Sequence, residues 1–248
     1  YWLILGKTIK YYLVSLSFFV NLIFANYQFE TVASNLDDAW SFDFLNENQI
    51  IFTEQPGKIK IVTISSGEIL NVEGTPKVQY ASQGGLSEIV LDPDFKKNNT
   101  LYLTYSALNE SGKSTLFLMS AELSNNSLIN KKVIFEANAS RRVPIHLGAK
   151  IDFLSDGTLL LTSGDGFDYK AQAQSLNNHF GKIIRINKDG SVPSDNPFVD
   201  IPNVLPEIYS YGHRNMQGLV VMEDGRIFEH EHGPRGGDEF NLIESGKN

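Results

Sequence analysis

The amino-acid sequence predicts an all-β protein of the β-propeller type, and three observations lead to this prediction. From about residue 28 onward, short runs of alternating apolar and polar residues are separated by turns rich in glycine, asparagine and aspartate, a pattern typical of strands. A unit of two apolar strands joined by a polar turn recurs along the chain. After the first 25 residues, no segment keeps helical periodicity for longer than about two turns.

The first segment reads as a secretory signal. Lys7 and Lys10 precede an apolar run over 11–25 that ends in Ala25, and such a run is shorter than a typical transmembrane span. We therefore expect a signal peptide over 1–25, a partial propeller domain over 26–248, and a periplasmic or secreted protein without a stable membrane span after cleavage. An uncleaved anchor is the alternative. The chain begins with Tyr1 and stops without a terminal turn, so we expect an N-terminal fragment.

The repeated unit has four copies, which lie at 40–53, 89–104, 151–162 and 219–228. Successive copies begin roughly 50 to 70 residues apart, the range of propeller blades with loop insertions. A blade cannot bury both of its faces alone, so blades stack around an axis. Four copies predict four blades, with a β-sandwich as the alternative. Loops that follow the same strand in each blade then converge on the axis and bring distant residues together.

Composition limits the partners of such a domain. The chain has 248 residues, of which 42% are hydrophobic, and a formal net charge of −8. This charge argues against nucleic acid or an anionic membrane surface as the main partner and is compatible with cation binding. The chain has no cysteine, which excludes disulfides, thiolate catalysis and cysteine-ligated metals.

Polar residues precede the second and third units at matching positions. Gln83 stands beside two glycines just before the second unit, and His146 follows Pro144 just before the third. A turn and a structural histidine are the simpler interpretations. The matching positions instead favour a shared site, in which His146 is the natural general base near neutral pH. We expect 163–168 to be a turn that closes a blade.

The last forty residues hold two further candidates. Arg214 and Asn215 precede the fourth unit, and a guanidinium suits an oxyanion or a carboxylate. The stretch 229–241 combines histidines, carboxylates and a Gly233-Pro234 turn, whose oxygen atoms suit calcium better than zinc. No glycine-rich phosphate loop followed by a helix and no Gly-x-Ser-x-Gly nucleophile elbow is present.

These segments together resemble the soluble PQQ-dependent glucose/sorbosone dehydrogenase family, most closely its bacterial aldose sugar dehydrogenase branch. The resemblance rests on an ordered set of segments, at 83–95, 146–148, 178–187, 189–198, 207–215 and 231–239. It implies a six-bladed propeller, of which this chain covers about four blades, with pyrroloquinoline quinone (PQQ) and Ca²⁺ on the axis. Basic residues that hold the cofactor's carboxylates would follow Asn248.

The resemblance also implies an activity and a role for each candidate. Aldose sugars would be oxidised at C1 to the lactone, with hydride passing to the C5 carbonyl of the quinone and electrons to an external acceptor. Gln83 would contact the quinone, His146 would take the proton of the C1 hydroxyl, and Arg214, with Asn215 alongside, would stabilise charge on the quinone oxygen.

The same resemblance assigns the metal ligands. The carbonyls of Gly233 and Pro234 would bind the calcium beneath the cofactor, and Glu239 would bind a separate calcium. The chain departs from the family pattern at four positions, Ala149, Lys150, Gly166 and Met216. Two other functions stay open: a non-catalytic propeller that binds a partner, and a calcium-dependent lactonase on a similar propeller.

Overall fold

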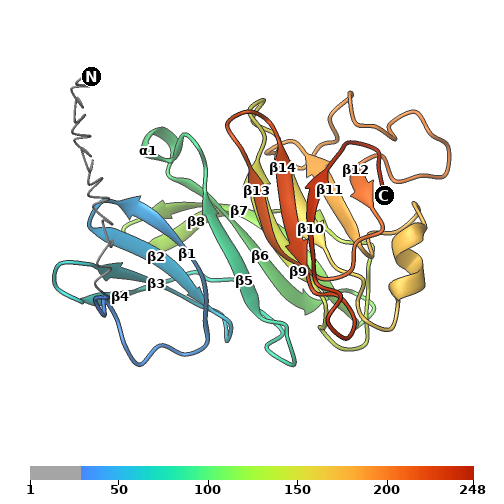
Figure 1. The fold of residues 1–248 in the computed structure, drawn as a ribbon. Coiled ribbons are helices and arrows are strands. Elements are labelled where there is room, and N and C mark those ends of the chain that lie inside the picture. Colours follow the sequence, from blue (N-terminus) through green and yellow to red (C-terminus); the bar gives the residue numbers. More distant parts are fainter. Residues whose placement is uncertain (1–28) are drawn as a thin grey trace, which may run out of the picture. The chain divides into compact units, whose positions relative to one another are not determined.

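Four antiparallel sheets follow one another along the chain in the computed structural model, which describes residues 29–248. Each sheet is a meander of neighbouring strands, and the sheets are arranged side by side as propeller blades (Figure 1). The leader and cleavage site predicted over 1–25 lie outside the described residues. Within residues 29–248, no helix has the length and apolar character needed to cross a membrane.

The first two blades each have four strands. Blade 1 consists of β1 (Ala39–Asn46), β2 (Gln49–Glu54), β3 (Lys58–Thr63) and β4 (Ile69–Val72). Blade 2 consists of β5 (Leu86–Leu91), β6 (Thr100–Leu108), β7 (Ser114–Ser124) and β8 (Ser127–Glu136), with the short helix α1 (Phe95–Asn98) between its first two strands.

The third blade also has four strands and the fourth has three. Blade 3 consists of β9 (Gly148–Phe153), β10 (Leu159–Ser163), β11 (Lys182–Ile186) and β12 (Ile208–Tyr211), with the 3-10 turn η1 (Lys170–Gln174) before β11. Blade 4 consists of β13 (Met216–Val221), β14 (Ile227–Glu231) and β15 (Glu239–Ile243). The four repeats predicted from the sequence fall on the first two strands of the four blades, so the propeller prediction is confirmed.

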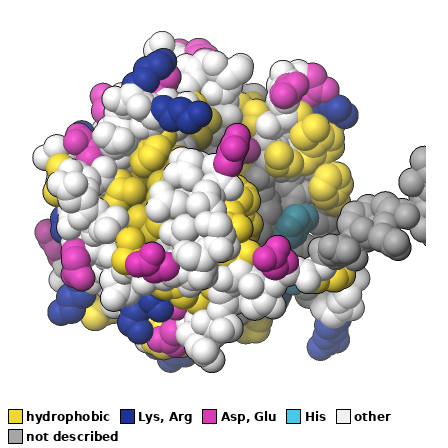
Figure 2. Space-filling model, turned by 90° about the vertical axis from the view of Figure 1, so that its left-hand side faces the viewer, with side chains coloured by type: hydrophobic (Ala, Val, Ile, Leu, Met, Phe, Trp, Pro, Cys, Tyr) yellow, Lys and Arg dark blue, Asp and Glu magenta, His cyan; other side chains and the backbone are white. Residues whose placement is uncertain are grey.

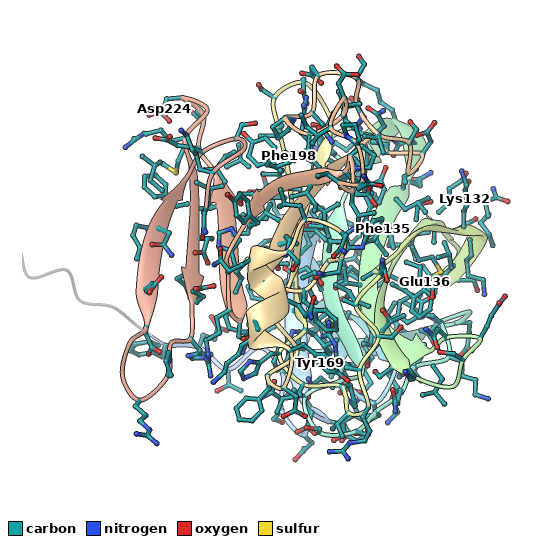
Figure 3. All side chains as sticks on the ribbon, turned by 90° about the vertical axis from the view of Figure 1, so that its right-hand side faces the viewer. Lys132, Phe135, Glu136, Tyr169, Phe198 and Asp224 are labelled. Carbon is teal, nitrogen blue, oxygen red and sulfur yellow. The ribbon has the colours of Figure 1, made fainter. Side chains whose placement is uncertain are left out.

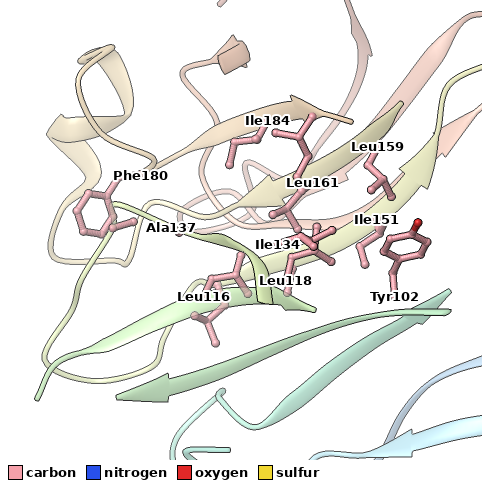
Figure 4. Packing of buried hydrophobic residues seen from close by; sticks show 14 residues of the cluster. Tyr102, Leu116, Leu118, Ile134, Ala137, Ile151, Leu159, Leu161, Phe180 and Ile184 are labelled. Atoms are coloured by element: carbon pink, nitrogen blue, oxygen red, sulfur yellow. The ribbon is translucent and has the colours of Figure 1, made fainter. Parts of the chain in front are cut away.

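Three apolar clusters join the blades, one at each interface. Strand residues alternate between faces, and the inward residues of neighbouring blades pack together. Ile51 of blade 1 belongs to the same cluster as Leu103 of blade 2, and Leu160 of blade 3 to the same cluster as Ile227 of blade 4. The cluster between blades 2 and 3 is drawn in Figure 4. Burial of each large aliphatic side chain stabilises the fold by about 1.5–3 kcal/mol, so contact between blades holds the arrangement together.

The loops outside the sheets also pack on this core. Tyr169, which precedes η1, stacks on Phe180 with ring centroids 4.6 Å apart. Tyr169 and Phe135 of β8, both labelled in Figure 3, pack against the cluster between blades 2 and 3. This packing fixes the segment between β10 and β11, which carries residues of the candidate site described below.

Apolar side chains stay exposed on the first and last blades. Phe42 and Phe44 alternate along β1 and are exposed, as are Phe240 and Leu242 on β15. Exposed apolar side chains are visible on the side of the molecule where blade 1 lies (Figure 2). Blades bury one another's faces, so these surfaces are where further blades of a closed ring would pack.

Candidate active site

The predicted site residues occupy equivalent positions in three blades. Gln83, His146 and Arg214 lie just before β5, β9 and β13, each the first strand of its blade. These first strands pack side by side, β5 against β9 and β9 against β13. Because the three residues precede the same strand of each blade, their loops lie at the same end of neighbouring strands. The propeller therefore brings together residues far apart in sequence.

Gln83 is bonded directly to the loop of His146. The side-chain Oε1 of Gln83 accepts a hydrogen bond of 2.8 Å from the backbone N–H of His146. Two glycines after Gln83 permit this position, because a Cβ on Gly85 would lie 2.2 Å from the carbonyl oxygen of Gln55. The segment is therefore more than a simple turn, since close backbone packing places the amide of Gln83 against the next blade.

His146 is paired with a carboxylate that the sequence analysis did not single out. Its Nδ1 lies 2.8 Å from Oδ1 of Asp165, and the two residues are 6% and 2% exposed. A hydrogen bond to an ionised carboxylate requires the proton on Nδ1, which leaves the lone pair on Nε2. The sequence analysis treated 163–168 only as a turn. The turn is present, and it also delivers the partner of the candidate base.

The backbone around His146 is constrained from several sides. His146 has a φ of 48°, in the left-handed region, and its carbonyl accepts a 3.1 Å hydrogen bond from the fully buried guanidinium of Arg141. A Cβ on Gly164 would lie 2.2 Å from that same carbonyl oxygen. Strained backbone persists only where its surroundings over-determine it and is common at functional sites. Ala149, a departure from the family pattern, also has a positive φ, of 74°.

Arg214 and Asn215 complete the chain of contacts. The Arg214 carbonyl accepts a 2.7 Å hydrogen bond from the backbone N–H of Asp165, and its guanidinium donates to the carbonyl of His232. Asn215 is buried. A cavity of about 200 Å³ is lined by Gln83 and Asn215, together with His232 and neighbouring residues. Hydrogen bonds thus link the loops of Gln83, His146 and Arg214, and Asn215 follows Arg214 directly. Gln83 and Asn215 line the cavity, whereas His146 and Arg214 are not among its lining residues.

The candidate calcium ligands lie beside this group. Gly233 and Pro234 follow β14 in a turn, where Gly233 N–H donates to Asp238 Oδ1 at 2.9 Å and the Pro234 carbonyl accepts from Gly237 at 3.3 Å. The same turn begins at His232, the acceptor of the Arg214 guanidinium. Glu239 does not lie in this turn but starts β15, where it pairs with Glu231 across the strands.

A second polar cluster contains His213, Glu229 and Glu231. All three side chains are buried, and one ligand atom of each lies within 4.8 Å of the others. Burial raises the pKa of Glu229 and of Glu231 to about 7 and lowers the pKa of His213 to about 4. The sequence analysis did not identify this cluster, although Glu229 and Glu231 are two apart and so share one face of a strand.

The geometry defines a class of protein: a β-propeller in which a histidine–aspartate pair, an arginine and two amide residues stand in hydrogen-bonded loops at the ends of the first strands. Comparison with known sequences identifies the family within this class. The sequence model of the family Glucose / Sorbosone dehydrogenase matches residues 36–248. The chain belongs to this family.

Individual relatives carry informative names. The chain is 31% identical to the aldose sugar dehydrogenase YliI of Escherichia coli, over 88% of this chain and 60% of that protein. It is also 31% identical to quinoprotein glucose dehydrogenase B of Acinetobacter calcoaceticus, over 90% of this chain and 52% of that protein. The chain therefore spans little more than half the length of these relatives.

A solved structure of similar fold contains the cofactor. The PQQ-bound aldose sugar dehydrogenase of Streptomyces coelicolor matches with a TM-score of 0.72 and 27% identity, over 88% of this chain and 64% of that chain. The four blades described above therefore correspond to a large part of a known dehydrogenase propeller.

Proposed function

We propose that the full-length protein is a PQQ-dependent dehydrogenase that oxidises aldose sugars at C1 to the lactone. The observation that carries this proposal is the buried pair of His146 and Asp165, which is tied to Gln83 on one side and to Arg214 on the other. The names of the relatives and the PQQ-bound neighbour support the same reaction class.

The residues present fit the cofactor. PQQ is a flat ortho-quinone with acidic groups, so its oxygens need hydrogen-bond donors and positive charge. The amides of Gln83 and Asn215 border one cavity, and the guanidinium of Arg214 is fixed nearby on the carbonyl of His232. When bound, PQQ supplies the carbonyl that accepts a hydride. Arg214 would stabilise negative charge on the oxygen of that carbonyl, with Asn215 alongside.

His146 would remove the proton of the sugar's C1 hydroxyl. Its Nε2 carries the lone pair, because Nδ1–H is engaged by Asp165 at 2.8 Å. The carboxylate fixes the ring orientation and stabilises the imidazolium that forms. As the hydroxyl proton passes to Nε2, the carbon–oxygen bond gains double-bond character and C1 gives up a hydride, so the sugar leaves as a lactone. This pair favours an enzyme over a binding module, which has no need of an oriented base.

Calcium would be held by oxygen atoms of the neighbouring turn. The carbonyls of Gly233 and Pro234 are hard donors of the kind that calcium prefers, and they lie in a turn bonded through His232 to Arg214. We assign Glu239 to a separate calcium. The ion near the quinone would act as a Lewis acid on the carbonyl that accepts the hydride. We also propose export to the periplasm or the medium and an external electron acceptor.

Reconstitution of the full-length protein tests this function. The apoprotein is mixed with PQQ and Ca²⁺, and dye reduction is followed with a panel of aldoses. We expect sugar-dependent turnover, and His146→Ala should lower turnover by at least about 10²-fold while PQQ still binds. Absence of turnover with every sugar, together with absence of PQQ binding, would refute the proposal.

A further inference from the structure

The cluster of His213, Glu229 and Glu231 plays no part in the chemistry above, and its geometry is that of a metal site. His213 comes from the loop before β13, and Glu229 and Glu231 come from the second half of strand β14. Glu229 and Glu231 project from the same buried face of the strand, and ligand atoms of all three residues lie within 4.8 Å of one another.

Each side chain of the cluster is held by a hydrogen bond to a neighbouring residue, and this bond uses only one of its two possible ligand atoms. His213 Nε2 is bonded to Ser210 Oγ at 2.7 Å, so Nδ1 faces the carboxylates, 3.8 Å from Glu229 Oε1. Asn241 donates to Glu229 Oε1 at 2.8 Å, and the backbone N–H of Arg214 donates to Glu231 Oε2 at 2.6 Å. Hydrogen bonds that fix ligands from behind are typical of metal centres.

The charge of the cluster is not balanced. Glu229 is 1% exposed, and its Oε2 has no hydrogen-bond partner among residues 29–248. No lysine or arginine side chain in that range forms a salt bridge with Glu229 or Glu231. Glu239 is the cross-strand partner of Glu231. Buried carboxylates without a counter-charge are costly, and a bound cation removes that cost.

We propose that His213, Glu229 and Glu231 bind a divalent transition-metal ion, of the Mn²⁺ or Zn²⁺ class. One imidazole nitrogen and two carboxylates suit these ions better than calcium, which prefers oxygen ligands alone. The site is distinct from the carbonyl oxygens of the Gly233–Pro234 turn. A cavity of about 500 Å³, lined by His213, Glu231 and Glu239, gives an ion a path to it.

A metal ion at this site would help to fix the position of Arg214 in the candidate active site. Glu231 holds the backbone of Arg214 at 2.6 Å and precedes by one residue the His232 carbonyl that accepts the Arg214 guanidinium. A metal that fixes Glu231 would therefore fix the position of Arg214 as well. The inference does not depend on the proposed activity, because the ligands and their orientation are independent of any sugar or quinone.

Metal binding to the full-length protein tests this proposal. Protein without PQQ is dialysed against a chelator and then titrated separately with MnCl₂, ZnCl₂ and CaCl₂, with bound metal counted by mass spectrometry. We compare wild type with Glu229→Gln, which keeps the shape of the side chain, and with His213→Gln. Glu223→Gln, an exposed change on the turn of the same hairpin, is the control.

We expect one bound Mn²⁺ or Zn²⁺ that raises the melting temperature of wild type and control, with affinity at least about tenfold weaker in both cluster variants. Equal affinity in wild type and Glu229→Gln would overturn the proposal. The proposal would also be overturned if wild type bound neither ion and Glu229→Gln had a higher melting temperature than wild type. In that case a proton shared between the two carboxylates, and not a metal, balances their charge. Binding of Ca²⁺ alone would overturn the choice of ion. None of these results depends on turnover.

Discussion

Replacement of Asp165 by asparagine should abolish most of the activity without disturbing the fold. Asparagine keeps the size of the side chain but removes the charge that holds the proton on His146 Nδ1 across 2.8 Å. The imidazole is then free to place its proton on Nε2, where it cannot accept the proton of the substrate hydroxyl. Both side chains are buried, so water does not substitute for the lost carboxylate.

The expected loss follows from what a positioned base contributes. General base catalysis is worth about 10²–10⁴ in rate, which corresponds to about 3–5 kcal/mol of barrier. Because the base acts in the transition state, kcat and kcat/KM should fall together, whereas KM and the affinity for PQQ should change little. Steady-state dye reduction and a PQQ binding titration on the full-length protein measure these quantities.

The matched control is Asp168→Asn. Asp168 is an exposed carboxylate three residues further along the same turn, and its replacement should leave kcat within about threefold, since surface substitutions rarely perturb a buried site. If Asp165→Asn retains kcat within that same range, the carboxylate does not orient the base and the mechanism is wrong.

Three further predictions concern the surroundings of the pair. Gly164→Ala would place a methyl group 2.2 Å from the carbonyl oxygen of His146, so unfolding in urea should show a loss of about 1–3 kcal/mol, and turnover should fall as well. Arg214→Lys keeps the charge but not the planar fork, so we expect PQQ affinity and turnover to fall by more than about tenfold in a binding titration and a dye assay; unchanged values would contradict the role of the guanidinium. Burial raises the pKa of Glu207, but the hydrogen bond from His179, a backbone hydrogen bond and the charge of His179 together outweigh burial and hold the pKa of Glu207 below 4.5. The ionised Glu207 side chain therefore stabilises the fold fully above pH 4.5, and this stabilisation is lost as pH falls through the lowered pKa that Glu207 has in the folded protein. The free energy of unfolding in urea between pH 6 and 3 should consequently depend less on pH in Glu207→Gln than in wild type.

Much of the fold was predictable because each blade begins with a hairpin that has a clear pattern. The predicted repeats coincide with β1–β2, β5–β6, β9–β10 and β13–β14, where apolar residues alternate on both sides of a polar turn. The later strands of each blade were harder to assign, because long loops interrupt them. The segment between β11 and β12, for example, runs over 187–207 without a strand.

The candidate site could be predicted in part for the same reason. Gln83, His146 and Arg214 stand at equivalent places before a repeat, so their convergence followed from propeller geometry. Asp165 was missed, although hairpin register contained the signal. In the β9–β10 pair, Leu161 lies opposite Ile151, and a one-residue irregularity places Ser163 opposite Gly148. Asp165 comes two residues after Ser163 and His146 two residues before Gly148, so the same register sets Asp165 opposite His146.

The cluster of His213, Glu229 and Glu231 could not be predicted with the same ease. The sequence pattern places Glu229 and Glu231 on one face of a strand, but both faces of a blade are hidden by neighbours. Only the packing of blade 4 on blade 3 shows that this face is buried, and that the loop before β13 brings His213 to it. The cluster depends on contacts between elements that no local pattern records.

The central claim is that His146 takes a proton while C1 of an aldose gives up a hydride. The most direct measurement is the rate at which a sugar reduces bound PQQ in a single turnover, followed by absorbance on the reconstituted full-length protein. An aldose carrying deuterium at C1 should react several-fold more slowly than the ordinary sugar, and His146→Ala should bind PQQ but leave it oxidised. Equal rates for the two sugars, or rapid reduction in His146→Ala, would contradict this mechanism.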